Sequence, residues 1–333
     1  MPEHDMNKPR VFWTSIAWQL PAMLAGIVVL SCPVSVIAQV RLDEADRFAR
    51  LLTQTAYRPS AMEIERDYLS QASPALHDLL DRNQTGALQL QAAVSSQRFA
   101  YRHALELCLP AIHRIKNQVD SWLMEVADGL GVPDDAGTKQ VVALFGAGTT
   151  GGMVEADRIV IALEVQCRFA NSEESAEQVL EAAIRHEAVH VHQLRRQLAD
   201  ARNSLLRQAM IEGLADWFST QQLGAVPPQA RERTVFGEAH EAYIWQQFRD
   251  DMNGDLLGHW MYGPGRPGEP ADLGYWIGSQ IVAAYMAQAH SQSQPESSAL
   301  QTLLTLESPE LILDASGYAP ATPMPPAPAP NQP

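Results

Sequence analysis

The spacing of hydrophobic and polar residues divides the chain into three parts. Over residues 42–131 apolar positions recur every three to four residues, which predicts a series of amphipathic helices. Two short apolar and β-branched runs, QVVALF (140–145) and RIVIALEV (158–165), are typical of strands. A helical pattern returns after Asn171 and continues to about Leu313. The chain is therefore predicted to be α+β and mostly helical, with a small β-sheet before the second helical part.

The first 38 residues have the pattern of an export signal. A short basic flank precedes an apolar segment (20–30) within a stretch that carries no charge. Small residues near its end favour cleavage after Ala38. Two alternatives stay open: a lipoprotein signal, with Cys32 as the lipidated first residue, and an uncleaved membrane anchor. Each places the rest of the chain in the periplasm or cell envelope of a bacterium, and the last two attach it to a membrane through the N-terminus.

Behind the signal segment (1–38), the sequence suggests three regions. Residues 39–138 form a helical N-terminal region, and residues 139–318 carry the predicted strands and the candidate chemistry. The tail, 319–333, is rich in proline and is predicted to be disordered because it cannot pack a core. Whether the N-terminal region covers the candidate site or forms a separate bundle is left open.

Charge and cysteine content narrow the choice of function. The formal net charge is −15 and the 24 Lys and Arg residues are scattered, so nucleic-acid binding is not expected. Beyond Cys32, the cysteines of the chain are Cys108 and Cys167. These two can pair in an oxidising compartment, but a disulfide and two buried thiols both stay open, because sequence does not show whether the sulfur atoms approach.

The segment GAGTTG (146–151) matches the G-x-G-x-x-G pattern of dinucleotide-binding proteins. In those proteins the glycines lead into a helix whose N-terminus binds pyrophosphate. Here only MVEAD separates the glycines from the next predicted strand, which is too little for a crossover helix. We interpret the segment as a flexible loop or a hairpin.

The segment IRHEAVHVHQ (184–193) carries the candidate chemistry. Within its H-E-x-x-H motif, His186 and His190 lie about 40° apart on one helix face, where two imidazoles can bind one metal ion. Both lie at the edge of an apolar stripe, whereas His192 lies about 120° from the centre of that stripe and is predicted to face solvent. The stripe comprises Leu180, Ile184, Val191, Leu194 and Leu198. Two hydrogen-bonded histidines without a metal are the alternative interpretation.

A second helical segment offers a third ligand. LLRQAMIEGLADWFS (205–219) is apolar almost throughout, yet it carries Glu212 and Asp216 four residues apart on one face. Two carboxylates in an apolar setting repel each other, and a cation removes the conflict. Glu212 can therefore be the third protein ligand of zinc, while Asp216 accepts the free ring N–H of His186. An exposed acidic pair without a metal is the alternative.

HEAVH followed by EGLAD resembles the gluzincin metallopeptidases, whose zinc is held by two histidines of the first motif and a glutamate of a second helix. More narrowly, EGLADW with DLGYWIGSQIVAAYM (272–286) resembles a family of predicted zinc-dependent proteases related to gliding-motility lipoprotein B of bacteria. The resemblance covers roughly residues 139–315 and implies a zincin-like domain. Two related groups do not match, because metzincins need glycine and histidine in place of Gln193 and Arg196, and the G-A-M-E-N motif of aminopeptidases is absent.

The ligands His186, His190 and Glu212 leave zinc an open position for water. Glu187 is placed to act as the general base that takes the proton of this water and passes it to the leaving amine. The predicted function is an exported zinc-dependent peptidase, an endopeptidase, with a polypeptide substrate. A non-catalytic envelope protein whose zinc only braces two helices is the alternative.

Peptide hydrolysis needs a further donor that stabilises the oxyanion. Tyr275 is the first candidate, since related peptidases use a downstream tyrosine or histidine, and His240, His259 and Tyr262 are rivals. The predicted strand 158–165, just before the metal helix, supports a polypeptide substrate because an extended peptide can add to a sheet edge.

Overall fold

The computed structural model describes residues 38–132, 138, 140–196, 204–255 and 257–320. The predicted signal segment lies outside the described residues except for Ala38, and so does the proline-rich tail from residue 321 onward. Lipidation at Cys32 and cleavage after Ala38 stay predictions. Among the described residues, no helix combines the length and the apolar character needed to cross a membrane.

The elements of the N-terminal part are mostly helical, and they begin with one short strand. They are β1 (Gln39–Arg41), α1 (Asp43–Gln54), α2 (Ala61–Asp67), η1 (Leu69–Gln71), α3 (Pro74–Arg82), α4 (Ala87–Ser96), α5 (Arg98–His103), the π-helical turn η2 (Ala104–Cys108), α6 (Leu109–Ile115) and α7 (Val119–Gly129).

The second part contains the remaining strands and the longest described helices. Its elements are β2 (Gln140–Leu144), β3 (Gly152–Glu155), β4 (Arg158–Ala162), α8 (Leu163–Gln166), η4 (Cys167–Phe169), α9 (Glu173–Leu194), α10 (Leu205–Leu223), η5 (Pro228–Ala230), α11 (Arg231–Asp251), α12 (Leu273–Ser291), α13 (Glu296–Thr305) and α14 (Pro309–Ser316). The prediction of an α+β, mostly helical chain with a small sheet is confirmed.

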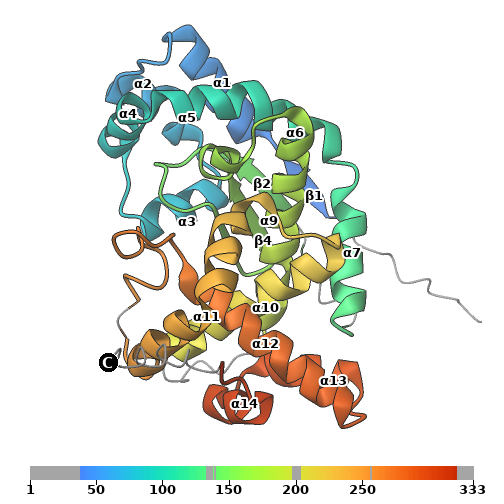
Figure 1. Ribbon diagram of the computed structural model, residues 1–333. Coiled ribbons are helices and arrows are strands. Elements are labelled where there is room, and N and C mark those ends of the chain that lie inside the picture. Colours follow the sequence, from blue (N-terminus) through green and yellow to red (C-terminus); the bar gives the residue numbers. More distant parts are fainter. Residues whose placement is uncertain (1–37, 133–137, 139, 197–203, 256, 321–333) are drawn as a thin grey trace, which may run out of the picture. The chain divides into compact units, whose positions relative to one another are not determined.

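The sheet has the strand order β1-β2-β4-β3. β2 pairs in parallel with β1 and β4, and β3 pairs with β4 in the antiparallel sense. β2 and β4 are buried along almost their whole length, as strands covered on both faces are. Helix α9 packs against β3 and β4, while α1 packs against β2 and α3 against β3 and β4 (Figure 1). β3 therefore forms one edge of a covered sheet.

Two strands differ from the sequence-based prediction. The run 158–165 was expected to be one strand, but β4 ends at Ala162 and the chain continues as α8. β3 was not predicted as a strand, because its GMVE sequence follows directly on a glycine-rich segment and is only four residues long. The segment 146–151, interpreted as a flexible loop or a hairpin, is a loop, and the hairpin of β3 and β4 follows directly after it.

The glycine-rich segment 146–151 binds a carboxylate of the chain itself. Oε1 of the fully buried Glu164 accepts hydrogen bonds from the N–H groups of Gly146 (3.1 Å) and Gly148 (3.0 Å). Gly148 has a φ of +78°, a conformation in which a side chain would be strained. Burial raises the pKa of Glu164 to about 7. The backbone amides that would receive a phosphate in a dinucleotide site are therefore already engaged.

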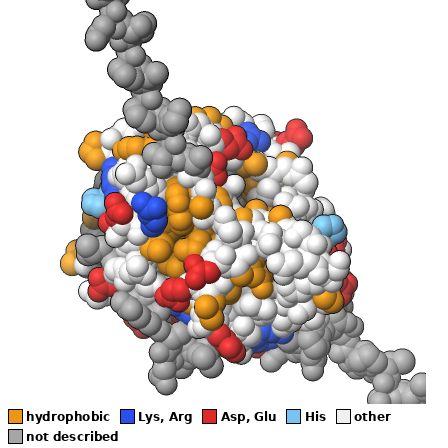
Figure 2. Space-filling view, turned by 60° about the horizontal axis from the view of Figure 1, so that its bottom comes forward, with side chains coloured by type: hydrophobic (Ala, Val, Ile, Leu, Met, Phe, Trp, Pro, Cys, Tyr) orange, Lys and Arg blue, Asp and Glu red, His pale blue; other side chains and the backbone are white. Residues whose placement is uncertain are grey.

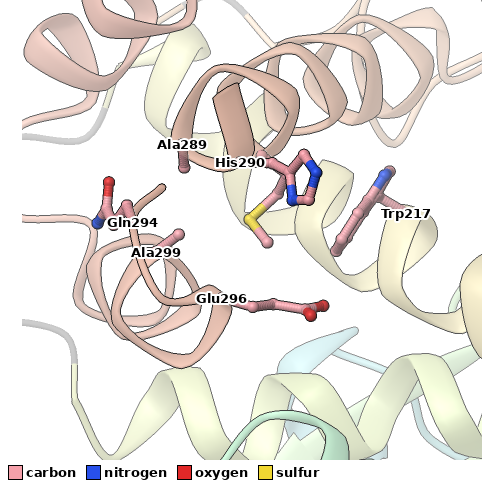
Figure 3. A pocket seen from close by; sticks show the side chains of 7 residues that line it. Trp217, Ala289, His290, Gln294, Glu296 and Ala299 are labelled. Carbon is pink, nitrogen blue, oxygen red and sulfur yellow. The ribbon is translucent and has the colours of Figure 1, made fainter. Parts of the chain in front are cut away.

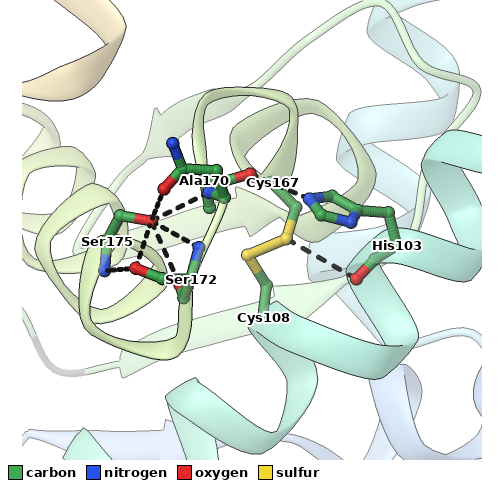
Figure 4. Close-up of a disulfide and its surroundings, with 7 residues drawn as sticks. His103, Cys108, Cys167, Ala170, Ser172 and Ser175 are labelled. Atoms are coloured by element: carbon green, nitrogen blue, oxygen red, sulfur yellow. Dashed lines mark hydrogen bonds between the residues drawn. A yellow bond between two sulfur atoms is a disulfide. The ribbon is translucent and has the colours of Figure 1, made fainter.

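A disulfide fixes the start of the longest described helix. Cys108 at the end of η2 is bonded to Cys167 at the start of η4, so the pairing that the sequence left open is present (Figure 4). His103 contacts the carbonyl oxygen of Ala170 through Nε2, at 2.9 Å. The N-cap of α9 follows, where the Ser172 hydroxyl accepts the Ser175 N–H. These contacts tie the N-terminal helices to α9.

Figure 2 shows the face that lies at the bottom of Figure 1. Hydrophobic side chains gather in its centre, and acidic side chains border them. Helices α13 and α14 lie at this end of Figure 1, and Leu311 of α14 is exposed. This face of the molecule therefore exposes apolar side chains to solvent.

Candidate metal centre

Helix α9 carries the HEAVH motif in its second half. Acidic residues in its first turn suit the positive end of the helix dipole, and a serine cap satisfies the first free N–H groups. His186 and His190, one turn apart, place their ring centroids 4.7 Å from each other at an interplanar angle of 81°. Their Nε2 atoms lie 3.0 Å apart. The helix therefore aims both rings at one point.

Helix α10 brings the third side chain to this point. The helix is capped by Ser204 and ends at Gly224, whose φ is +66°. Gly213, next to Glu212, lies against Gly278 of α12, and a methyl group on either glycine would overlap the backbone of the other helix. The EGLAD and GYWIG segments thus contain the glycines that let α10 and α12 approach closely.

Three ligand atoms converge at the centre. Oε2 of Glu212 lies 3.2 Å from Nε2 of His186 and 3.1 Å from Nε2 of His190. All three side chains are partly buried. Atoms bound tetrahedrally to zinc at about 2.0–2.1 Å lie about 3.3 Å apart. The group therefore has the dimensions of a zinc coordination shell.

The other ring nitrogen of each histidine faces an acceptor. Nδ1 of His186 lies 3.0 Å from Oδ1 of Asp216, and Nδ1 of His190 lies 2.6 Å from Oε1 of Gln193. The amide of Gln193 is oriented by its own N–H bond to the carbonyl of Ile211. Each Nδ1 can therefore donate a proton, and in the neutral form of each ring this leaves the Nε2 lone pair facing the carboxylate of Glu212. Three acceptors without a donor are the surroundings that a cation needs, so the residues fit a bound zinc ion.

Asp216 has a second partner that the sequence did not indicate. Nη2 of Arg233, from α11, lies 2.5 Å from Oδ2 of Asp216, and the guanidinium lies 5.1 Å from the centroid of the Tyr275 ring. Burial alone would raise the pKa of Asp216, but Arg233 and His186 hold it below its ordinary value. Burial alone would lower the pKa of His186, but its hydrogen bonds with Asp216 and Glu212 raise it to about 10. Without a metal the centre therefore holds protons, which a metal must displace.

Glu187 lies on α9 next to His186, and its side chain lies against the edge strand β3. Its side chain is 8% exposed, and a Cβ atom on Gly152 of β3 would overlap its Oε1 atom. Burial raises the pKa of Glu187, while His190 and His186 act in the opposite sense. The carboxylate therefore occupies a place that only a glycine on the neighbouring strand leaves free.

Both tyrosines considered as oxyanion donors lie at the centre. The ring of Tyr275, in the first turn of α12, stacks on His186 at a centroid distance of 6.2 Å. The hydroxyl of Tyr262 donates to Oε1 of Glu212 at 2.7 Å. The rival histidines have other surroundings: Nδ1 of His240 contacts the carbonyl of Phe236 in its own helix, and His259 is exposed.

The prediction for His192 was wrong. Its side chain is only 2% exposed instead of facing solvent, while Leu194, placed on the apolar stripe, is 56% exposed. Helix α9 packs against α6, α7, α10 and two strands, so it is buried on nearly every side and a one-sided helical wheel does not describe it. Burial lowers the pKa of His192 to about 4, helped by Arg196, and its Nδ1 has no hydrogen-bond partner in the described chain.

Sequence reasoning missed three residues around the centre: Gln193, Arg233 and Gly152. A signal existed for Gln193, which stands three residues after His190 on the same helix face. Arg233 and Gly152 come from elements distant in sequence, and no local pattern marks them.

A comparison with protein families matches residues 132–302, more than half of the chain, to a family described as predicted Zn-dependent protease (DUF2268). The chain belongs to this family. The family description and the group His186, His190 and Glu212 agree on zinc as the cofactor. No curated protein and no solved structure matched the chain.

A separate hollow of about 200 Å³ lies between α10, α12 and α13 (Figure 3). Trp217, His290 and Glu296 are among the side chains around it. None of its lining residues belongs to the metal centre.

Proposed function

We propose that the protein is an exported zinc-dependent endopeptidase that hydrolyses peptide bonds of a polypeptide substrate. The observation that carries this proposal is the convergence of three acceptor atoms, from His186, His190 and Glu212, within 3.2 Å of one another. The placement among gluzincins, and the relation to gliding-motility lipoprotein B, rest on the HEAVH and EGLAD motifs. Export rests on the pattern of residues 1–38.

The chemistry divides between the metal and the side chains. Bound zinc supplies Lewis acidity, which lowers the pKa of water and polarises a carbonyl group. Glu187 accepts one proton from the attacking water as the new carbon–oxygen bond forms, and then delivers it to the amine nitrogen as the carbon–nitrogen bond breaks. Asp216 and Gln193 hold the two imidazoles in the tautomer that presents Nε2 to the metal.

Tyr275 is the oxyanion donor in this proposal. Burial raises the pKa of its hydroxyl well above the ordinary value, so the group keeps its proton and can donate a hydrogen bond. The cation–π contact with Arg233 and the stacking on His186 hold the ring at the centre. Tyr262 is a poorer candidate because its hydroxyl donates to Glu212, which is itself a proposed metal ligand.

An extended polypeptide suits the open edge of the sheet. Among the described strands, β3 pairs with β4 and ends the strand order, so its outer backbone groups can pair with a peptide. Gly152 of this strand lies against Glu187. A peptide added to β3 would therefore run beside the proposed general base.

The test is proteolysis by the purified full-length protein, loaded with zinc, on an unstructured protein substrate. Glu187→Gln should lower kcat by about 10²–10⁴-fold while zinc content stays unchanged. Glu174→Gln, the same substitution at an exposed position of α9, should cleave as the wild type does.

Two results would contradict the proposal in different ways. Full activity in Glu187→Gln would remove Glu187 from the mechanism. Bound zinc without cleavage of any peptide in a library would favour the non-catalytic alternative, in which zinc only braces α9 and α10.

A further inference from the structure

The two oxygen atoms of Glu212 have different partners. Oε2 faces Nε2 of both histidines, at 3.2 and 3.1 Å. Oε1 accepts the hydroxyl proton of Tyr262 at 2.7 Å. The hydrogen bond therefore occupies the one oxygen that does not point to the metal position.

The backbone holds Tyr262 in a conformation that non-glycine residues rarely adopt. Its φ is +60°, and its N–H donates to Oδ1 of Asp272 (2.8 Å), which itself has a φ of +58°. Such conformations persist where the surrounding structure enforces them, and they concentrate at functional sites. The sequence does not require a left-handed turn here, since neither residue is a glycine.

A buried anchor precedes Tyr262. Trp260 is 2% exposed, its ring N–H donates to Asp251 (2.9 Å), and its carbonyl accepts the N–H of Gly274 in α12 (2.8 Å). The guanidinium of Arg266 lies 4.6 Å from the centroid of its ring. The segment is thus fixed to both α11 and α12 just before the tyrosine.

The side chain itself lies at the surface of the centre. Tyr262 is 59% exposed, although its hydroxyl reaches the partly buried Glu212. Its ring meets that of Tyr275 edge to face, at 6.0 Å and 83°. An exposed tyrosine contributes little to the core, so packing does not account for a strained, anchored residue at this place.

We propose that Tyr262 is a positioning residue that keeps Glu212 a one-oxygen ligand of the metal. A carboxylate can bind a metal through one oxygen or through both. Binding through both would take up a position that the reaction needs for water and for the substrate carbonyl. By donating to Oε1, Tyr262 stabilises the one-oxygen mode. This inference rests on the proposed zinc site but does not depend on which bond is hydrolysed.

The experiment compares the wild type with Tyr262→Phe after loading with Co²⁺, whose visible absorption is stronger in four-coordinate than in five-coordinate sites. Tyr262→Phe should weaken this absorption and shift it, as a second carboxylate oxygen enters the coordination shell. Removal of an outer partner of a ligand should also change zinc affinity by roughly tenfold, measured by competition with a chelating dye.

Tyr243→Phe is the matched control. It removes a tyrosine hydroxyl that is also exposed and also donates to a glutamate, Glu269, at 3.2 Å, but outside the metal centre. Its spectrum and affinity should equal those of the wild type.

The outcomes separate this inference from the proposed function. A wild type that binds neither Co²⁺ nor zinc would overturn the metal site and this inference with it. Normal metal binding with identical spectra for Tyr262→Phe and Tyr243→Phe would overturn only the role of Tyr262.

Discussion

The molecule buries the acidic side chains of Glu164 and Glu212 in two centres, and the groups that surround them are of opposite kinds. At Glu164, two backbone N–H groups of the glycine-rich segment donate to one carboxylate oxygen, so donors converge on an acceptor. At Glu212, the Nε2 atoms of two imidazoles converge on a carboxylate, so acceptors meet acceptors when the rings are neutral. Oε1 of Glu164 needs no further partner, although Oε2 has none in the described chain, whereas the second centre needs protons or a metal cation.

The comparison shows which feature distinguishes a structural buried carboxylate from a candidate metal ligand. Burial alone does not distinguish the two, because both are at least 91% shielded, with exposures of 0% and 9%. The hydrogen atoms of the neighbouring groups make the difference: at the metal centre, Asp216 and Gln193 accept the Nδ1 protons, so the neutral imidazoles offer no hydrogen atom to Glu212. The glycine-rich segment binds a carboxylate of the chain itself, whereas two largely buried helices, α9 and α10, carry the proposed ligands.

The largest expected effect is that of Glu164→Gln on the free energy of unfolding. Burial raises the pKa of Glu164 from 4.5 to about 7, so between these values the folded chain holds a proton that the unfolded chain has released. The stability contributed by Glu164 is therefore greatest below pH 4.5 and is lost as the pH rises through 7. Glu164→Gln removes this dependence and should gain about 2–3 kcal/mol relative to the wild type between pH 5 and pH 8.

Urea unfolding of both proteins at the two pH values measures this gain. Glu232→Gln, which changes an exposed glutamate of α11, gives the background. An equal difference between Glu164→Gln and the wild type at both pH values would contradict the account of Glu164.

The next effect concerns the metal centre. Asp216→Asn removes the charge that accepts the His186 proton and leaves Arg233 without its partner. Zinc affinity should fall by about 10–100-fold, as for other residues that orient a ligand histidine. Competition with a chelator measures the change, and Asp250→Asn, at an exposed position of α11, is the control. Unchanged affinity would show that Asp216 does not orient the histidine.

The smallest expected effect concerns the space for Glu187. The methyl group added by Gly152→Ala would overlap Oε1 of Glu187 and displace the carboxylate. Proteolysis should show a kcat lowered by roughly tenfold, with unchanged zinc content, because a general base acts only within hydrogen-bond reach of its water. Gly258→Ala, whose methyl group would meet nothing within 4 Å, should have no such effect. A wild-type kcat in Gly152→Ala would mean that the carboxylate has room to move.

The sequence allowed the chemistry of the centre to be predicted because its signals are local. Helical spacing places His186 and His190 together, and an acidic residue in an apolar helix needs a partner wherever that helix packs. Both arguments hold without knowledge of the fold. The family comparison, over residues 132–302, agrees with the zinc that they predict.

The rest depended on packing between distant elements. Arg233 reaches Asp216 from another helix, and Gly152 reaches Glu187 from an edge strand that the pattern did not reveal. His192 was misplaced because the helical wheel assumes one buried face, and α9 is enclosed by helices and strands on several sides. The periodicity of apolar residues identifies one buried face of a helix. Whether the other faces are also buried depends on the elements that pack against them.

The central claim is that His186, His190 and Glu212 bring three metal-ligating atoms to one point, and the most direct test is the zinc content of purified protein by elemental analysis. The wild type and Glu164→Gln should each carry about one zinc per chain, whereas His190→Ala and Glu212→Ala should carry almost none. A wild type free of zinc after purification with added metal, or full zinc content in Glu212→Ala, would contradict the account.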